Sequence, residues 1–165
     1  MTTEFDRLID ATDKKILVIL QDAGRTSHAE IGRSLGMAAS AIFERVKKLE
    51  ERGFIRGYAA VISPEAVDLG LLAFLSVRTE DPVGGDTTAR ALAKRPEILE
   101  VHHVAGEDCY LAKVRVKDTA ALSRLMKEVG AIRGVRATRT TVVLETTKEA
   151  ASLPIPVSKG KKEKA

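Results

Sequence analysis

One predicted helix, over residues 38–52, carries short polar and basic side chains on a single side. With about 100° of rotation per residue, the other side is an apolar stripe of Ile42, Val46 and Leu49. The side chains that point away from this stripe are Ser40, Glu44, Lys47 and Lys48. Side chains of these types contact base edges and phosphates when a helix lies in the major groove of DNA. The helix is therefore a candidate for reading DNA.

The same charged side also fits a helix that is only solvated. Glu44 and Lys48 lie four residues apart, which is the spacing of an ion pair that stabilises a helix. Arg45 and Arg52 flank the apolar stripe, so each is a candidate for a phosphate contact or for an ion pair within the protein. Three further arginines are candidates for contacts to the DNA backbone: Arg25, Arg33 and Arg56. Contacts of this kind position a protein on DNA without specifying sequence.

Two adjacent histidines and a single cysteine are the other side chains able to carry chemistry. Neighbouring residues of a strand point to opposite faces, so His102 and His103 cannot both bind one metal ion from a regular strand. A thiol nucleophile needs an orienting group and a pocket, and the sequence shows neither for Cys109. We therefore expect no catalytic residue, no metal site and no cofactor.

The composition is that of an ordinary soluble globular protein. Of the 165 residues, 44% are hydrophobic and 30% are charged. Only 4% are aromatic and none is tryptophan, which argues against a carbohydrate binder. One cysteine excludes an internal disulfide and a cysteine-based metal cluster. No apolar run approaches the roughly 18 residues that cross a bilayer, and no secretory signal is visible. We expect a cytoplasmic protein with no membrane partner.

The net charge of +4 is unevenly distributed along the chain. Residues 1–60 carry a net charge of +1 and residues 61–150 are neutral, whereas residues 151–165 hold four lysines and one glutamate. Residues 148–165 are therefore predicted to be a disordered basic tail. Such a tail would add a sequence-independent, salt-sensitive contribution to DNA affinity.

Two shorter helices precede the candidate reading helix. The first begins after Asp10 and ends before Gly24. The second begins after Ser27, which forms a capping box with Glu30, and ends at Gly36. Two short helices joined by a glycine-containing turn form a helix-turn-helix, expected here at about residues 28–47.

A wing and a linker are expected to follow the helices. Residues 54–62 are predicted to be a small β-hairpin or a single extended wing, so residues 1–60 form a winged helix-turn-helix domain. Ser63-Pro64 and Gly70 mark a linker over residues 61–70.

The spacing of the apolar residues changes after the linker. Strands are expected near residues 71–77, 98–105, 110–117 and 134–145, with a helix after the first and after the third. This order over residues 71–147 predicts an α+β, ferredoxin-like βαββαβ domain with both helices on one face of the sheet. The other face has no covering layer, so we expect the protein to self-associate through it.

Short segments throughout the chain match a known family. In the first domain they are Asp10-x-x-Asp13-x-x-Ile16-Leu17, Gly24-Arg25, Glu30-Ile31, Arg45-Val46-Lys47-Lys48-Leu49-Glu50 and Gly53-Phe54-Ile55-Arg56-Gly57-Tyr58. In the second domain they are Val104-Ala105-Gly106 and Thr138-Arg139-Thr140. Residues 10–62 resemble the DNA-binding domain, and residues 71–147 the ferredoxin-like (RAM-type) effector domain, of the Lrp/AsnC (feast/famine) family of transcription regulators.

The resemblance implies a nucleoid-associated, sequence-specific DNA-binding regulator, not an enzyme, that responds to an amino acid bound at a subunit interface. It implies a homodimer that binds double-stranded DNA and assembles into a tetramer or octamer. The implied DNA-binding residues are Arg25, Ser40, Ala41, Glu44, Arg45, Lys47, Lys48 and Arg56. The implied effector-binding residues are Val104, Gly106, Glu107, Asp108, Cys109, Tyr110, Thr138 and Thr140. Carboxylates suit an α-ammonium group, and turn amides with threonine hydroxyls suit an α-carboxylate.

Two departures from the family pattern bear on these assignments. Ala38 stands where the family has a serine N-cap, so we expect Ser40 to cap the reading helix and to shift its start. In the effector turn, Cys109 replaces an aspartate and Asp108 replaces an aromatic residue. These differences leave the identity of the ligand open, and an acidic turn without any ligand stays an alternative.

Two other functions stay open as well. Sirohaem decarboxylase subunits share this two-domain shape, and His102 or His103 would then serve tetrapyrrole chemistry. An architectural DNA-compacting protein would have no effector and little sequence preference. Binding of an amino acid separates the regulator from the architectural protein.

Overall fold

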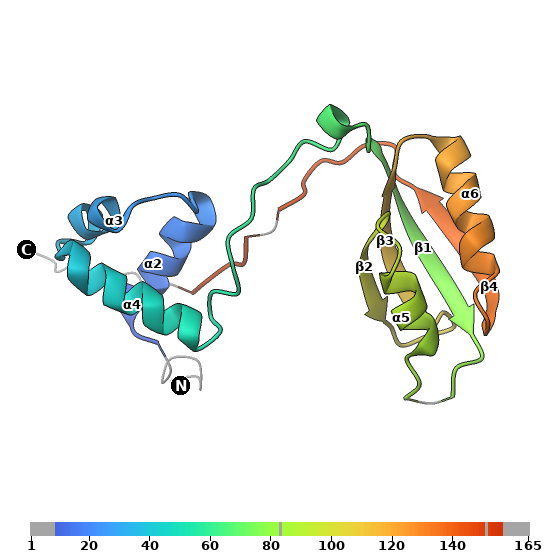
Figure 1. Ribbon diagram of the computed structural model, residues 1–165, viewed down its shortest axis with the longest axis horizontal. Coiled ribbons are helices and arrows are strands. Elements are labelled where there is room, and N and C mark those ends of the chain that lie inside the picture. Colours follow the sequence, from blue (N-terminus) through green and yellow to red (C-terminus); the bar gives the residue numbers. More distant parts are fainter. Residues whose placement is uncertain (1–8, 83, 151, 157–165) are drawn as a thin grey trace, which may run out of the picture. The chain divides into compact units, whose positions relative to one another are not determined.

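The computed structural model describes residues 9–82, 84–150 and 152–156 (Figure 1). The chain divides into two compact units. Residues up to Ala60 belong with those from Glu149 onward, and Val61–Lys148 form the second unit. Within the described ranges, no helix is long and apolar enough to cross a membrane.

The N-terminal unit is built from helices α2 (Ala11–Asp22), α3 (His28–Leu35) and α4 (Ala39–Glu51). The predicted capping box at Ser27 is present, and Asp10, where the first helix was expected to begin, forms a second capping box with Asp13. The Asp10 carboxylate accepts a hydrogen bond from the backbone N–H of Asp13 at 2.8 Å, and the Ser27 hydroxyl accepts one from Glu30 at 3.2 Å. Each cap satisfies N–H groups that a helix leaves unpaired at its start. The predicted helix-turn-helix is confirmed in α3 and α4.

The predicted apolar stripe of α4 is the core of this unit. Ile42, Val46 and Leu49 are at most 4% exposed, and they pack with the fully buried Ile16 of α2 and Ile31 of α3. Because the stripe fixes the rotation of α4 about its axis, the polar side of the helix must face solvent.

Two glycines permit the turn between α3 and α4. Gly36 ends α3 with a φ of 68°, in the left-handed region that favours glycine. At Gly32, an added Cβ would lie 2.5 Å from the carbonyl oxygen of Met37. The backbone N–H of Met37 also donates to the carbonyl oxygen of Gly32 at 2.8 Å. The turn therefore packs directly on the α3 backbone.

Two local expectations are wrong. Ala38 is the N-cap of α4 without any side-chain hydrogen bond, and Ser40 lies inside the helix, so Ser40 does not cap it. The hydrogen bond between Met37 and Gly32 holds the residues before α4 without a polar cap. Residues 54–62 contain no strand, so the hairpin alternative for the wing is also wrong. This segment leads instead to the short 3₁₀ helix η1 (Glu65–Val67).

Part of the expected tail is also ordered against the first unit. Leu153 forms two hydrogen bonds with Gln21, and Ile155 packs on the apolar cluster of the helices. The expectation of a disordered segment starting at residue 148 is wrong for these residues, because they have contacts 132 residues away in sequence. Of the five lysines in the expected tail, Lys148 is described, and the four after residue 156 lie outside the described residues.

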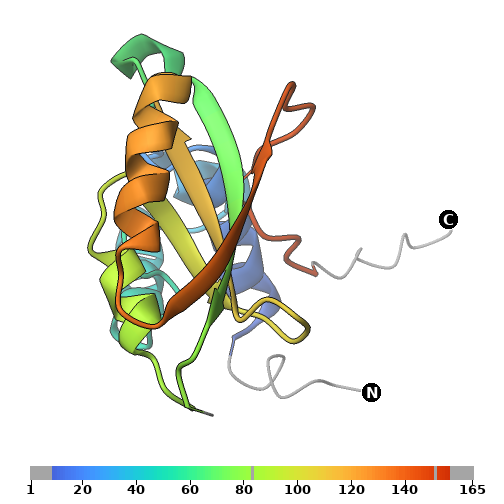
Figure 2. The ribbon, with the colours of Figure 1, turned by 90° about the vertical axis from the view of Figure 1, so that its right-hand side faces the viewer.

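The second unit is a four-stranded antiparallel sheet in the order β2-β3-β1-β4. Its strands are β1 (Leu71–Thr79), β2 (Ile98–His103), β3 (Tyr110–Val116) and β4 (Val135–Val142). The helices α5 (Thr87–Ala93) and α6 (Thr119–Gly130) cover one face, as Figure 2 shows. The predicted ferredoxin-like fold is confirmed.

The two faces of this sheet differ in burial. Ala73, Leu75 and Val77 of β1 point toward the helices and are at most 1% exposed. The alternate residues Leu72 and Phe74 point to the uncovered face and are 6% and 37% exposed. The apolar run of residues 71–77 predicts a strand buried on both faces, and within one chain this burial is only partly achieved.

We expect Gly32→Ala to destabilise the helix-turn-helix by about 1–3 kcal/mol, because the added methyl group meets a backbone carbonyl that cannot move freely. Thermal unfolding followed by circular dichroism measures the loss. The control is Gly130→Ala in α6, where an added Cβ has no neighbour within 4 Å. This control is expected to be neutral or to stabilise by up to about 1 kcal/mol. Equal unfolding temperatures for the two variants would refute the close approach at Gly32.

Candidate nucleic-acid interface and effector site

The polar side of α4 is exposed, as the helical arrangement requires. Ser40, Glu44, Lys47 and Lys48 are all exposed. The Lys47 ammonium lies 3.9 Å from the Glu51 carboxylate, whereas the described residues form no Glu44–Lys48 ion pair. Lys48 therefore has no ion pair within the described ranges, and its charge is available to a phosphate.

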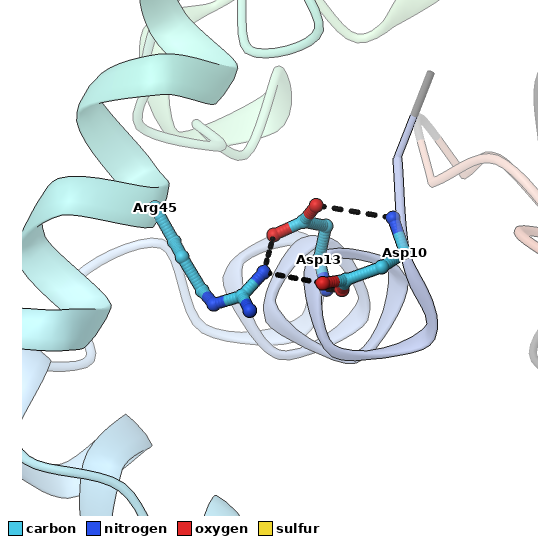
Figure 3. A network of polar contacts seen from close by, with 3 residues as sticks. All are labelled: Asp10, Asp13 and Arg45. Atoms are coloured by element: carbon cyan, nitrogen blue, oxygen red, sulfur yellow. Dashed lines mark hydrogen bonds and ion pairs between the residues drawn. The ribbon is translucent and has the colours of Figure 1, made fainter. Parts of the chain in front are cut away.

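Arg45 is fixed to α2 (Figure 3). Its Nη1 donates to Oδ2 of Asp10 and to Oδ1 of Asp13, each at 2.7 Å. The side chains of Arg45 and Asp13 are 32% and 15% exposed, so this ion pair is partly shielded from water. Of the two roles left open for Arg45, the geometry favours the ion pair within the protein.

The pKa values of this group follow from the same contacts. Burial acts to raise the pKa of Asp10, but hydrogen bonds from the Asp13 backbone and from Arg45 outweigh burial and lower that pKa. Hydrogen bonds to Asp13 and Asp10 raise the pKa of Arg45. Both charged forms are therefore favoured in the folded state.

The other candidate DNA-binding residues lie in two places. Several surround a hollow of about 340 Å³ whose lining residues are Asp13, Ala41, Glu44, Arg45, Lys48, Leu49 and Arg52. Arg25, in the turn before α3, and Arg56, after α4, are exposed and lie outside this lining. The structure thus places four candidate residues of α4 around one hollow: Ala41, Glu44, Arg45 and Lys48. The other two candidates on α4, Ser40 and Lys47, lie outside its lining, as do the two arginines on the flanking segments.

Phe43 is a surface residue that the sequence reasoning missed. Its side chain is 49% exposed on α4, and its ring meets the ring of His28 edge-on, with centroids 5.6 Å apart. The helical spacing contained the signal, because Phe43 lies outside the apolar stripe at 42, 46 and 49. A phenylalanine at such a position can contact the methyl group of thymine.

The effector turn joins β2 and β3. The backbone N–H of Val104 donates to the Cys109 carbonyl oxygen at 3.0 Å, and that of Cys109 donates to Val77 at 2.9 Å. Gly106 has a φ of 135°. Cys109 packs partly buried against the core of the second unit. The sheet therefore holds the turn closely through its backbone.

Tyr110, a candidate effector contact, is only 2% exposed. Its hydroxyl donates to the carbonyl oxygen of Gly85 at 3.0 Å and lies 3.4 Å from Oδ2 of Asp81. Burial raises the pKa of Tyr110, and the nearby Asp81 carboxylate raises it further. The Tyr110 side chain thus belongs to the core of this unit.

The turn carboxylates and the threonines are on different faces of the sheet. Asp108 pairs with Arg139 at 2.7 Å, and Glu107 pairs with Arg78 at 3.3 Å. Arg139 lies opposite Ser76 in the β1–β4 register and points to the uncovered face. Thr138 and Thr140 lie opposite Val77 and Leu75, whose side chains are buried under the helices. One chain therefore does not bring the two sets together in a single pocket.

The adjacent histidines are separated as strand geometry requires. His102 Nε2 lies 3.2 Å from Glu100, whereas the His103 ring packs 5.2 Å from the ring of Tyr110. Among the described residues, no group of three histidine, cysteine or acidic side chains is placed to hold a metal ion.

We expect Arg45→Ala to lower the free energy of unfolding by about 1 kcal/mol at neutral pH, the upper range for a partly exposed ion pair. The pKa of Asp10 is lowered in the folded state, so this contribution is present above the unfolded pKa of about 4 and is lost on further acidification. Urea unfolding at several pH values measures the difference. Lys47→Ala, at the weaker pair with Glu51, is the control. A loss that is unchanged at pH 3 would contradict the ion-pair role.

Comparison with known proteins agrees with both halves of this description. Residues 9–56 match the winged helix-turn-helix DNA-binding family, and residues 72–153 match the Lrp/AsnC ligand binding domain. The chain is 40% identical over 147 residues to the HTH-type transcriptional regulator FL11 of Pyrococcus horikoshii, covering 89% of this chain and 97% of the relative. It is 37% identical over 150 residues to the leucine-responsive regulatory protein of Escherichia coli K12, covering 89% and 92% respectively.

Solved structures give the same result. A transcriptional regulator of Neisseria meningitidis in complex with L-Met superposes with a TM-score of 0.83 at 34% identity, covering 88% of this chain and 96% of that one. A feast or famine regulatory protein of M. tuberculosis complexed with L-methionine superposes with a TM-score of 0.81 at 36% identity, covering 89% and 99%. The helix-turn-helix, the ferredoxin-like sheet and these matches over nearly the whole length agree: the chain belongs to the Lrp/AsnC family of transcriptional regulators.

Proposed function

We propose that this protein is a sequence-specific, DNA-binding transcription regulator that places α4 in the major groove of double-stranded DNA. The observation that carries the proposal is the exposed polar side of α4 on a helix whose other side is core. Ser40 and Glu44 are the proposed base contacts, and Lys47 and Lys48 the proposed phosphate contacts, within a surface that includes Ala41. Arg25 and Arg56 add backbone contacts from the flanking segments.

The proposed effector is an amino acid. Two structural relatives are complexes with L-methionine, and the matching domain of this chain carries an acidic turn and two threonines. These two sets lie on different faces of the sheet in one chain, so a site that uses both needs a second copy. The ligand therefore binds at an interface between protomers, with Val104, Gly106, Glu107, Asp108 and Cys109 contributed by the turn, and Thr138 and Thr140 by β4.

The uncovered face of the sheet is the proposed dimer surface. Phe74 is 37% exposed there, and Leu72 lies on the same face of β1. Pairing two such faces buries apolar area that one chain leaves in water. Dimers then assemble further into tetramers or octamers, and each assembly sets the spacing of its DNA-reading helices. We propose no enzymatic activity and no cofactor, and a site of action on chromosomal DNA.

We expect Lys48→Ala to weaken DNA binding and to reduce the slope of log affinity against log salt by about 1, because one phosphate contact is lost. Fluorescence anisotropy with duplex DNA at several salt concentrations measures both quantities. The control is Lys127→Ala, which removes an exposed lysine from α6 in the other unit. Salt-insensitive binding, or no binding to DNA near its own gene, would refute the proposed function.

A thermal-shift screen of the twenty amino acids tests the effector. We expect at least one saturable gain, about 2.7 kcal/mol of stability at a concentration 100 times Kd. Thr140→Val is expected to reduce this gain, whereas Ser123→Ala, at an exposed hydroxyl on α6, leaves it unchanged. The absence of any response, together with weakly selective DNA binding, would favour an architectural DNA-binding protein.

A further inference from the structure

Phe43 is an exposed apolar side chain on the helix that is proposed to read DNA. The apolar stripe of α4 is at most 4% exposed, whereas Phe43 is 49% exposed. With about 100° of rotation per residue, Phe43 lies between the stripe and the polar side of the helix. Its neighbours one turn away are Ser40, three residues before it, and Lys47, four residues after it, and both are exposed. The ring is therefore next to side chains that are proposed to contact DNA.

A contact with α3 holds the exposed ring. The ring of His28 meets it edge-on, with centroids 5.6 Å apart and an angle of 69° between the ring planes. His28 is partly buried and is the first residue of α3, directly after Ser27, whose capping box with Glu30 fixes the start of that helix. Edge-to-face pairs of aromatic rings are favourable beyond the area that they bury. The rotation of the Phe43 ring is therefore restricted before any ligand covers it, so little side-chain entropy is lost on binding.

The surroundings of the ring favour one kind of occupant. A protein interface buries a contiguous apolar patch, whereas Phe43 has a hydroxyl group and an ammonium group beside it, those of Ser40 and Lys47. Such polar groups suit the base edges and phosphates of a duplex. The apolar group that base edges present in the major groove is the C5-methyl group of thymine, and phenylalanine is one of the side chains that contact it. The methyl group of 5-methylcytosine is at the same ring position.

We propose that Phe43 is a specificity-determining residue that contacts the C5-methyl group of a pyrimidine in the major groove, and that His28 is the positioning residue that holds its ring. This inference rests on the proposed DNA-binding function and adds a base preference that the hydrogen-bonding side chains of α4 do not supply. Covering one methyl group removes about one methylene-sized unit of apolar surface from water, which corresponds to about a fourfold gain in affinity.

The test removes the methyl group from the DNA and the ring from the protein. Selection from a random-sequence duplex library first gives the preferred sites of the wild-type protein. Thymines of one half-site are then replaced one at a time by deoxyuridine, which differs only in lacking the methyl group, and affinity is measured by fluorescence anisotropy. We expect one position at which wild-type binding weakens about fourfold, whereas Phe43→Ala binds the two duplexes equally.

Cytosine and 5-methylcytosine at the same position distinguish the two sources of the methyl group. If 5-methylcytosine gains as much over cytosine as thymine gains over deoxyuridine, Phe43 reads the methyl group on either base. A gain for thymine alone assigns the contact to thymine, with a neighbouring side chain that reads another group of the base. In both cases the gain is expected to disappear in Phe43→Ala.

Three further variants separate the contact from the stability of the domain, because partial unfolding lowers the affinity for both duplexes equally and leaves their ratio unchanged. Val18→Ala removes a 39% exposed apolar side chain from α2 and is expected to keep the fourfold ratio. Phe43→Leu retains an apolar side chain and is expected to keep part of the ratio. His28→Ala is expected to lower the ratio, since the ring loses its neighbour. An unchanged ratio in His28→Ala would overturn the positioning role.

Other results would overturn the contact itself. If the wild-type protein selects a sequence but binds thymine and deoxyuridine duplexes equally at every position, the inference fails while the proposed function stands. A changed oligomeric state of Phe43→Ala in analytical ultracentrifugation, with an unchanged ratio, would show that the ring contacts protein instead. If the wild-type protein selects no sequence at all, the proposed function fails and the inference fails with it.

Discussion

The placement of α4, the proposed DNA-reading helix, depends on the contact between Arg45 and the start of α2. Asp10 and Asp13 each use one carboxylate oxygen for the capping box and the other for Arg45. The group that satisfies the free N–H groups of α2 is therefore also the group that binds α4. Negative charge at a helix N-terminus is favourable in itself, so α2 holds the two carboxylates in place for the arginine. A change at one of the three residues alters both the cap of one helix and the position of the other.

This contact matters more because α4 has no polar cap of its own. Ala38 precedes it without a side-chain hydrogen bond, and such a loss costs about 0.5–2 kcal/mol of helix stability. Other interactions compensate: the apolar stripe packs against α2 and α3, the turn packs on Gly32, and Arg45 binds the acidic pair. The start of α4 is thus determined by tertiary contacts, and Ser40 is left free on the polar side.

The sequence predicts best the features that depend on neighbouring residues. The Asp10 and Ser27 caps, the stripe of α4 and the apolar run of β1 are local patterns, and they give the order and nature of the elements. Contacts between distant residues are harder to predict. The amide of Gln21 gives no sign that it pairs with Leu153, and the spacing of Arg45 suits a phosphate as well as a carboxylate. The expectation that Ser40 caps α4 is wrong because the cap preference is weaker than the packing of the turn.

The sheet explains why the proposed effector site needs more than one chain. Asp108 and Glu107 are neutralised by Arg139 and Arg78, whereas Thr138 and Thr140 are on the opposite side of β4. An α-amino acid presents one positive and one negative group on a single carbon, so its binding groups must lie within a few ångströms of each other. If these residues do bind it, only a second copy can complete the set. In the proposed mechanism the ligand then stabilises an assembly and not merely a fold. Coupling between ligand and DNA follows from linkage, because that assembly would also fix the distance between the DNA-reading helices.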